Sequence, residues 1–425
     1  MNALRAALPE VGRRWDGECT RSRLALGVAT TTIVGACLFG LTRAVGAEHF
    51  DCFHVCVGLA AALLGGYGAL RAAGSVSAER RQGTWDLLRL TPLSSFEIAA
   101  GKFLGAPMFP AILALSLLPW ALAGAPLSKY GTPDGALPLL AFLAATALGS
   151  WAIGLMVSAL ADERLGNSEG TQAFVVVLLL PLISGSVPSF ARNNAELGFE
   201  TGQYWGATLP LWLIAAATWL AFGAWAFEAA RWRIAHDKLE PLRPWRISAF
   251  MIFVVLYFAG FKAYDGAERS ALIAWPYVAA LVASLAEPWS RVQWRTWLSG
   301  AAARRLSGAP VWMRALATLA AIAAALSLSA PEAPRFPILL ALFAARDVCF
   351  LQWCRLRVRK NADFVAVVYL AILYGLPLLI GGIAAHGQVN YFFAAIVKPN
   401  LGFALNVLPG LVEAAAAAAL LFHAV

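Results

Sequence analysis

The chain has 425 residues, of which 60% are hydrophobic and 13% are charged, and its mean hydropathy is +0.68. Because soluble domains usually carry about 25% charged residues, these values exclude an ordinary water-soluble globule. They also exclude a disordered chain, and the 36 Gly and 22 Pro residues show no fixed period that would indicate collagen. Most of the chain is therefore expected to lie in lipid.

Apolar segments long enough to cross a membrane recur along the whole chain. A membrane-spanning helix needs about 20 apolar residues to cross roughly 30 Å of hydrocarbon. The sequence therefore predicts an all-α, polytopic integral membrane protein with about 12 transmembrane helices. The expected spans are residues 24–45, 53–70, 103–124, 136–160, 173–191, 207–228, 247–262, 271–289, 313–330, 336–354, 364–385 and 401–423.

The Lys and Arg residues are distributed unevenly between the connections. With the N-terminus inside, 25 of the 33 fall in cytoplasmic segments, 7 in outer segments and one, Arg346, within a span. Because cytoplasmic loops retain positive charge, both termini are expected in the cytoplasm of a multi-pass protein of the cytoplasmic (inner) membrane. Attraction to anionic lipid then accounts for the net charge of +9 without a nucleic-acid partner.

Cysteine and histidine cluster once, in the run Cys52-Phe53-His54-Val55-Cys56 near the outer end of the second span. A structural zinc site usually has four ligands, and no fourth ligand is evident in the sequence. We therefore expect these cysteines to pack as small apolar residues, and we predict no metal site. No combination of His, Cys, Ser and acid resembles a catalytic set, so no catalytic residue is assigned.

The connection between the second and third spans, residues 77–102, is the most informative segment of the chain. Gly83 can break the preceding helix, and Thr84 can cap a short helix that Pro92 ends. On that helix Trp85 and Leu88, with Leu87 as a further candidate, form an apolar face. The segment is therefore expected to form a helical elbow at the inner surface of the membrane. Residues 78–91 are expected to be largely helical and outside the hydrocarbon layer, with Trp85 and Leu88 packed on or beside the ends of neighbouring helices.

Two readings of this elbow remain open on physical grounds alone. An apolar face flanked by charges suits a site where a soluble partner pushes on the membrane helices, but it also suits a helix that only lies among the headgroups. Ser94 and Glu97 stand at the spacing of a capping box, so a new helix is expected to begin at that point.

The elbow sequence resembles that of a known family. The run from Glu79 to Ser94, Glu-Arg-Arg-Gln-Gly-Thr-Trp-Asp-Leu-Leu-Arg-Leu-Thr-Pro-Leu-Ser, followed by Glu97-Ile98 and Gly101-Lys102, is similar to the signature of permease subunits of ABC-2 type transporters. The resemblance covers about residues 1–230 and implies a six-helix permease domain at 24–230, preceded by an amphipathic connecting helix at 1–23. In this family the elbow is the coupling helix that meets the ATPase subunit. The residues that carry this implied role are Glu79, Arg80, Gly83, Thr84, Trp85, Leu88, Thr91, Pro92 and Leu93.

The chain contains no ATP-binding motif of its own. A P-loop needs GxxxxGK followed by Ser or Thr, whereas Gly101-Lys102 is followed by Phe103. The resemblance therefore implies a transport subunit that is not itself an enzyme, with ATP and Mg bound by a partner ABC ATPase subunit, expected as a dimer. A second permease copy and membrane lipid are the other partners expected. The cargo is not identified by the sequence: lipid, glycan, drug and peptide all remain candidates.

The second half of the chain departs from the usual six-span permease. A basic cytoplasmic linker is expected at 231–246 and a C-terminal membrane domain of about six helices at 247–425. The loop Glu287–Trp297 weakly echoes Glu79–Trp85, so this half can be read as a degenerate repeat or as an added module. The outer connection 188–210 is expected to contain short helical pieces.

Three ionisable residues are expected inside the membrane in this half. Arg346 and Asp347 fall near the middle of span 336–354, and Glu413 falls at nearly the same depth in span 401–423. Adjacent helix positions point about 100° apart, so Asp347 is not expected to neutralise Arg346 well, and Glu413 is expected to pair with it. This cluster could lock the helices together or form a polar wall on a transport path. An ion-coupled secondary transporter that uses Asp347 and Glu413 is therefore the alternative to an ABC exporter, and a lipid-modifying enzyme is a weaker third reading.

Overall fold

The computed structural model describes residues 9–46, 52–127, 133–160, 201–235, 244–261, 272–286, 289–300, 308–329, 335–358 and 403–425, together with 365, 368 and 372. Within these ranges eight helices are long and apolar enough to cross a membrane. The protein is therefore an all-α, polytopic membrane protein. The expected span 173–191 lies outside the described residues, as does nearly all of the span 364–385.

Two compact units make up the chain. The first comprises Met1–Gly202 and Thr208–Leu239, and the second comprises Gln203–Ala207 and Glu240–Val425. The boundary at 239/240 falls inside the segment 231–246 that the sequence predicts as a linker. Part of that segment is helical, because α11 (Leu211–Ala235) continues to residue 235 and α12 (Pro244–Ala259) begins at 244.

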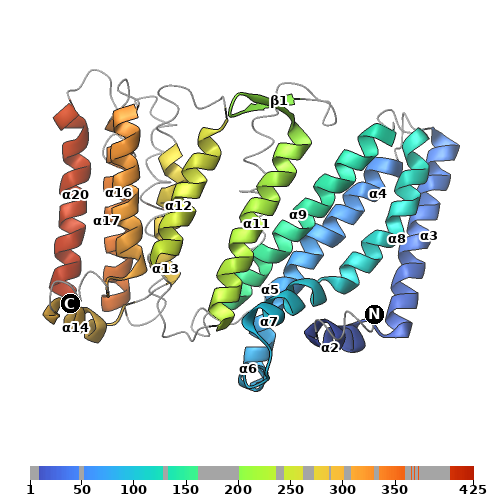
Figure 1. Cartoon of the computed structure of the whole chain (residues 1–425), viewed down its shortest axis with the longest axis horizontal. Helices are drawn as coiled ribbons and strands as arrows, with labels where there is room; N and C mark the ends of the chain where they lie inside the picture. The colour runs from blue at the N-terminus through green and yellow to red at the C-terminus, as the bar shows by residue number, and fades with distance from the viewer. Residues whose placement is uncertain are drawn as a thin grey trace. The chain divides into compact units, whose positions relative to one another are not determined.

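The first unit is built from helices that Figure 1 shows side by side around α9. Its helices are α2 (Pro9–Glu18), α3 (Arg21–Val45), α4 (Cys52–Ala61), α5 (Gly68–Arg81), α6 (Trp85–Arg89), α7 (Ser95–Gly105), α8 (Met108–Gly124), α9 (Pro133–Leu160) and α11. Helices α9 and α11 approach closely at two glycines, since a Cβ on Gly223 would lie 2.8 Å from the Cα of Gly149. Small residues at this crossing are typical of helix packing in lipid, where backbones must come close to gain contacts.

A π-helical turn, η1 (Ala62–Tyr67), joins α4 to α5, so that one continuous helix of 30 residues runs from Cys52 to Arg81. The widened turn changes the regular hydrogen-bond ladder, and the indole N–H of Trp151 donates to the Leu64 carbonyl at 2.6 Å. Trp151 fits there because Gly68 has no side chain. A Cβ on residue 68 would lie only 2.4 Å from the Trp151 Nε1 atom. The second span is therefore longer than the predicted 53–70.

In the second unit α12 is followed by α13 (Ala274–Ala286), α14 (Arg291–Ser299), α16 (Val311–Ser329), α17 (Arg335–Arg357) and α20 (Phe403–Ala424). The spans predicted at 313–330, 336–354 and 401–423 correspond to α16, α17 and α20. With 16 and 13 residues, α12 and α13 are only about 24 and 20 Å long, shorter than a full crossing. The largest apolar cluster of the unit joins these helices through Met251, Ala280, Trp294, Trp312, Leu319, Val348 and Leu421.

Residues 201–210, the described part of the segment in which short helical pieces were expected, form a β-hairpin. Strands β1 (Thr201–Tyr204) and β2 (Ala207–Pro210) pair across the two-residue turn Trp205-Gly206. Both turn residues have positive φ, 49° and 80°, which is the geometry of a tight hairpin turn. The sixth span therefore begins at residue 211 instead of the predicted 207, and residues 188–200 lie outside the described part of the chain.

Candidate functional site: the elbow and its anchors

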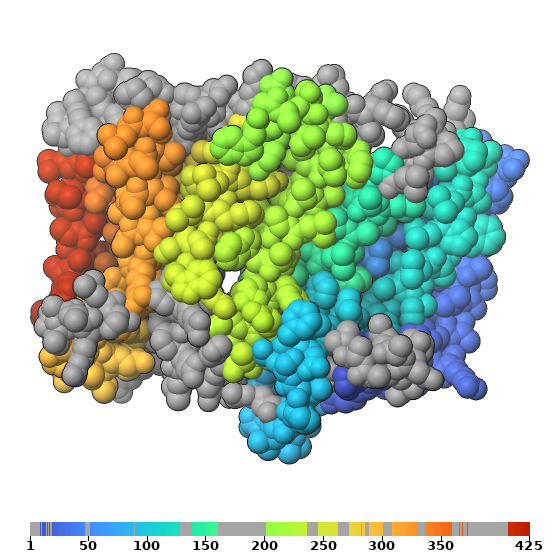
Figure 2. Space-filling model, in the orientation of Figure 1, coloured from blue at the N-terminus to red at the C-terminus, as the bar shows by residue number. Residues whose placement is uncertain are grey.

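The elbow connects two membrane-spanning segments of the first unit. It lies between the spans Cys52–Arg81 and Met108–Leu127, and it contains α6 and the first turns of α7. Figure 1 shows α6 protruding beyond the ends of α5 and α7, and Figure 2 shows the same segment standing out from its surroundings. Residues 78–91 are largely helical, as expected: residues 78–81 form the end of the long helix Cys52–Arg81, and residues 85–89 form α6.

A glycine turn produces the sharp exit from α5. Gly83 has φ +68°, its N–H donates to the Arg80 carbonyl at 3.2 Å, and the Thr84 N–H donates to the Glu79 carbonyl at 3.0 Å. This pair of bonds is a Schellman motif, in which one residue adopts the left-handed helical conformation. Glycine is favoured at that residue because it has no Cβ atom to clash with the backbone. Thr84 precedes α6, but its hydroxyl donates to the Glu79 carbonyl at 3.3 Å and makes no capping bond to α6. The predicted side-chain cap at Thr84 is therefore wrong.

The predicted apolar face of α6 points into the protein. Trp85 and Leu88 are 8% and 9% exposed and pack in one cluster with side chains of α5, α7, α9 and α11. The outward-facing apolar residues are instead Leu87, which is 66% exposed, and Leu90, which is 82% exposed. Trp85 and Leu88 therefore pack against neighbouring helices, as expected, and anchor the elbow to four of them, whereas Leu87 and Leu90 project away from the bundle.

A buried ion cluster lies directly behind the elbow. The carboxylate of Glu79 on α5 lies 2.6 Å from the Lys102 Nζ atom on α7 and also pairs with Arg13 on α2. Lys102 is fully buried and Glu79 is nearly so, whereas the Arg13 side chain is 53% exposed. The Trp85 ring lies 5.8 Å from the Lys102 ammonium and 5.3 Å from the guanidinium of a further cation, Arg80. Helices α2, α5, α6 and α7 are therefore joined at one point.

The helix after the elbow begins with the predicted capping box. The Glu97 N–H donates to the Ser94 hydroxyl at 3.2 Å, and the Ser94 N–H donates to the Glu97 carboxylate at 2.7 Å. Hydrogen bonds from the Ser94 side chain and backbone lower the pKa of Glu97. The capping box at Ser94 and Glu97 is therefore confirmed.

This cap is expected to weaken in acid. Because the pKa of Glu97 is lowered in the folded state, the cap's stabilisation is present above the unfolded pKa and is lost as the pH falls through the folded pKa. Hydrogen exchange, corrected for intrinsic rates, should show falling protection at residues 94–97 in this range. Glu97→Gln keeps the hydrogen-bonding pattern and is the control, since its protection should not change with pH. Equal pH dependence in both proteins would show that Glu97 does not control the cap.

The intramembrane charges form a second cluster, in the second unit. Arg346 lies eleven residues from both ends of α17, so it sits at the centre of that helix. Its Nε atom donates to Asp347 at 2.8 Å, its Nη1 atom pairs with Glu413 on α20, and its guanidinium lies 4.4 Å from the Phe343 ring centre. The Tyr277 hydroxyl of α13 also donates to Asp347. The cluster thus joins three helices.

One expectation about this cluster is wrong. Arg346 and Asp347 were not expected to neutralise each other, because adjacent helix positions diverge. The structure places them in direct contact, since the long Arg346 side chain bends back to reach the neighbouring carboxylate. Arg346 therefore forms ion pairs with two carboxylates, those of Asp347 and Glu413.

Cys52 and Cys56 both lie buried in an apolar cluster with Phe53, Val57 and Ala121. Their sulfur atoms are 3.7 Å apart, and the Cys52 N–H donates to the Thr42 hydroxyl at 3.1 Å. Within the described residues no group of three or more His, Cys, Asp and Glu side chains could hold a metal ion.

The helical architecture and the elbow between two spans define a multi-pass membrane protein with a structured connection at the membrane boundary. The family model described as ABC-2 family transporter protein matches residues 20–348, which is more than half of the chain. The chain therefore belongs to the ABC-2 transporter family and is a membrane permease component of an ABC transporter. No curated protein and no solved structure matches it.

The family match extends well beyond the part of the chain that carries the sequence resemblance. Residues 1–230 were read as the family-like part, whereas the match continues through α12, α13, α14 and α16 to residue 348 in α17. Arg346 and Asp347 therefore fall within the matched region, and Glu413 lies beyond it. The family match therefore includes residues 247–348 of the second half.

Proposed function

We propose that this permease exports its cargo by using the elbow to receive the movement of a separate ABC ATPase subunit. A dimer of that subunit would bind ATP and Mg, and the chain itself would hold neither. The complex is assigned to the cytoplasmic membrane, with the elbow on the cytoplasmic side, where the excess of Lys and Arg is expected. A second permease copy would complete the transport path.

The observation that carries this proposal is that the apolar side chains of α6 face in two different directions. Trp85 and Leu88 hold the helix against the bundle, whereas Leu87 and Leu90 face outward. A force applied at the outward pair would reach α5, α7, α9 and α11 through the anchors, and α2 through the Glu79 cluster. Because packed helices move as bodies, such a push can switch a transporter between two arrangements.

The nine residues implied by the family resemblance then divide into distinct roles. Gly83 and Thr84 set the turn, and Thr91, whose hydroxyl donates to the Leu88 carbonyl at 2.6 Å, closes the helix before Pro92. Trp85 and Leu88 hold α6 from its own inner face, and Glu79, Arg80 and Leu93 lie beside it and help to fix its position. The contact surface itself is assigned to Leu87 and Leu90.

Co-purification with the ATPase subunit tests this assignment. Leu87→Asp with Leu90→Asp should release the ATPase from the permease, because two desolvated carboxylates would replace an apolar contact. The matched control is Val292→Asp on α14, which charges an apolar residue that is 73% exposed but belongs to another helix. The proposal fails if the elbow variant retains the ATPase as well as the wild type, or if the permease alone transports its cargo with an ion gradient.

A further inference from the structure

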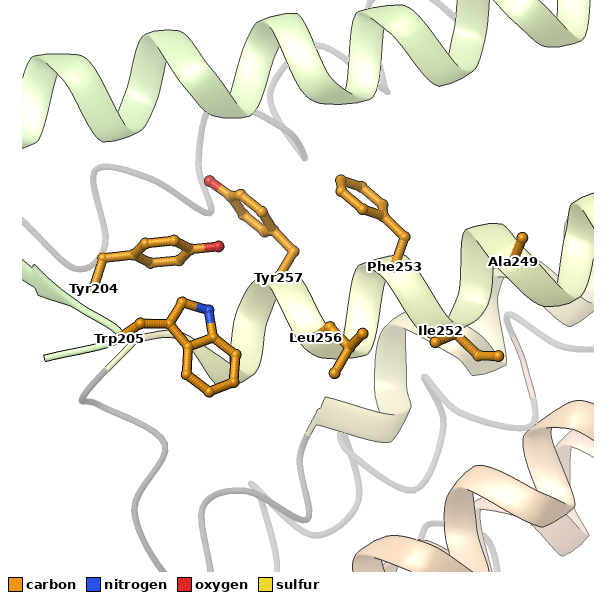
Figure 3. Close-up of a pocket in the computed structure, with 7 residues that line it drawn as sticks. All are labelled: Tyr204, Trp205, Ala249, Ile252, Phe253, Leu256 and Tyr257. Atoms are coloured by element: carbon orange, nitrogen blue, oxygen red, sulfur yellow. The ribbon is translucent and has the colours of Figure 1, made fainter.

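An apolar groove lies along α12 in the second unit and has a volume of about 600 Å³. Figure 3 shows three aromatic side chains gathered at one end and Ala249 at the other. The lining residues are Tyr204, Trp205, Ala249, Ile252, Phe253, Leu256 and Tyr257. None of them carries a charge at neutral pH, so the groove is suited to a hydrocarbon chain and not to an ionic ligand.

We propose that this groove holds one acyl chain of a bilayer phospholipid, with the headgroup at the Tyr204–Trp205 end. The residues from Ala249 to Tyr257 cover about 12 Å of an apolar helix that is itself only about 24 Å long. Ile252 and Leu256 are 48% and 55% exposed on this apolar helix, so an acyl chain lying in the groove would cover apolar surface that the protein leaves open.

The aromatic end supplies groups that a phospholipid headgroup can use. Two tyrosine hydroxyls and the Trp205 indole N–H are the polar side-chain groups of the lining, and Figure 3 shows them at the end farthest from Ala249. Tyr and Trp favour the membrane–water boundary because their rings are apolar and their tips form hydrogen bonds. Phosphate and ester oxygens of a phospholipid lie at the same boundary and accept such bonds.

The backbone holds Trp205 in place at a conformational cost. Its φ is +49°, a region that bulky residues rarely adopt, and only at positions that surrounding contacts enforce. Its N–H donates to the Gly260 carbonyl at 2.7 Å, and the neighbouring Tyr204 pairs with Phe261. Gly260 is required there, because a Cβ would lie 2.4 Å from the Trp205 Nε1 atom. The aromatic end of the groove is therefore built into the fold.

Photolabelling of the full chain in liposomes tests this site. The probe is a phosphatidylcholine with a photoreactive diazirine in its acyl chain, and labelled peptides are mapped by mass spectrometry. Adducts should concentrate on residues 249–257. Ala249→Trp should fill the groove and reduce these adducts about tenfold, which corresponds to roughly 1.4 kcal/mol of lost binding.

The control is Ala321→Trp, which adds the same side chain to an exposed position of α16. It should leave labelling of 249–257 unchanged, and Trp205→Phe should reduce labelling less than Ala249→Trp does. Circular dichroism and gel filtration identify variants that fold. Adducts spread evenly over the exposed faces of α12, α16 and α20, or labelling that survives Ala249→Trp in a folded protein, would overturn the proposal.

Discussion

Replacing Glu79 by Ala is expected to destabilise the first unit by about 3–5 kcal/mol, the usual cost of breaking a buried ion pair. Glu79 lies 2.6 Å from the Lys102 ammonium, and neither side chain has appreciable contact with solvent. Without the carboxylate, the buried cation loses the anion that offsets its desolvation. Thermal unfolding of the purified protein in detergent should show a clear fall in midpoint.

Two further variants separate the buried pair from the exposed one. Glu79→Ala combined with Lys102→Met should recover most of the loss, because no charge then remains buried in that pair. Arg13→Ala should cost about 1 kcal/mol or less, since the Arg13 side chain is 53% exposed and solvent screens its pairing with Glu79. Equal damage from Arg13→Ala and Glu79→Ala would mean that the exposed pair, and not the buried one, holds the elbow.

Replacing Arg346 by Ala is expected to be the most damaging single change in the second unit, at about 3–5 kcal/mol. Arg346 contacts both Asp347 and Glu413, so its loss leaves two carboxylates at the centre of membrane helices without the cation they share. The difference is measured by titrating the purified protein with urea in mild detergent and following its unfolding. Arg346→Ala with Glu413→Gln should be less damaging than Arg346→Ala alone, because one carboxylate is then neutral.

Arg357 at the end of the same helix provides the control for this prediction. Its guanidinium lies 3.3 Å from the His423 Nδ1 atom in an exposed position, so Arg357→Ala should change stability little. If the single and double changes at Arg346 and Glu413 were equally damaging, the two side chains would not be coupled. That result would rule out a structural role for the contact between Arg346 and Glu413.

Hydropathy and turn chemistry predict a large part of this fold. The spans that correspond to α3, α9, α16, α17 and α20 follow from the length of their apolar segments alone. In lipid a helix forms because it pairs the backbone N–H and C=O groups within the segment. The break at Gly83 and the capping box at Ser94 follow from residue types whose backbone effects are local.

The errors arise where tertiary contacts decide. Leu87 was a candidate for the packed face of α6, but it is 66% exposed, because α9 and α11, which are distant in sequence, cover the side that carries Trp85 and Leu88. Lys102 was placed at the end of a cytoplasmic connection, where a cation is usually solvated, but it is fully buried and pairs with Glu79. The widened turn at Ala62–Tyr67 accepts a hydrogen bond from Trp151 in another helix, a contact that the local sequence does not reveal. The hairpin turn at Trp205-Gly206 places a tryptophan at positive φ, which no propensity favours.

The most direct measurement of coupling through the elbow is site-specific cross-linking in membranes that contain the whole complex. A photoreactive amino acid is placed at position 90 on the elbow or at position 292 on α14, both of which are exposed in the chain by itself. Position 90 should form an adduct with the ATPase subunit, and ATP should change its yield, whereas position 292 should not. An adduct from 292 only, or none from 90 in a complex that hydrolyses ATP, would contradict coupling through the elbow.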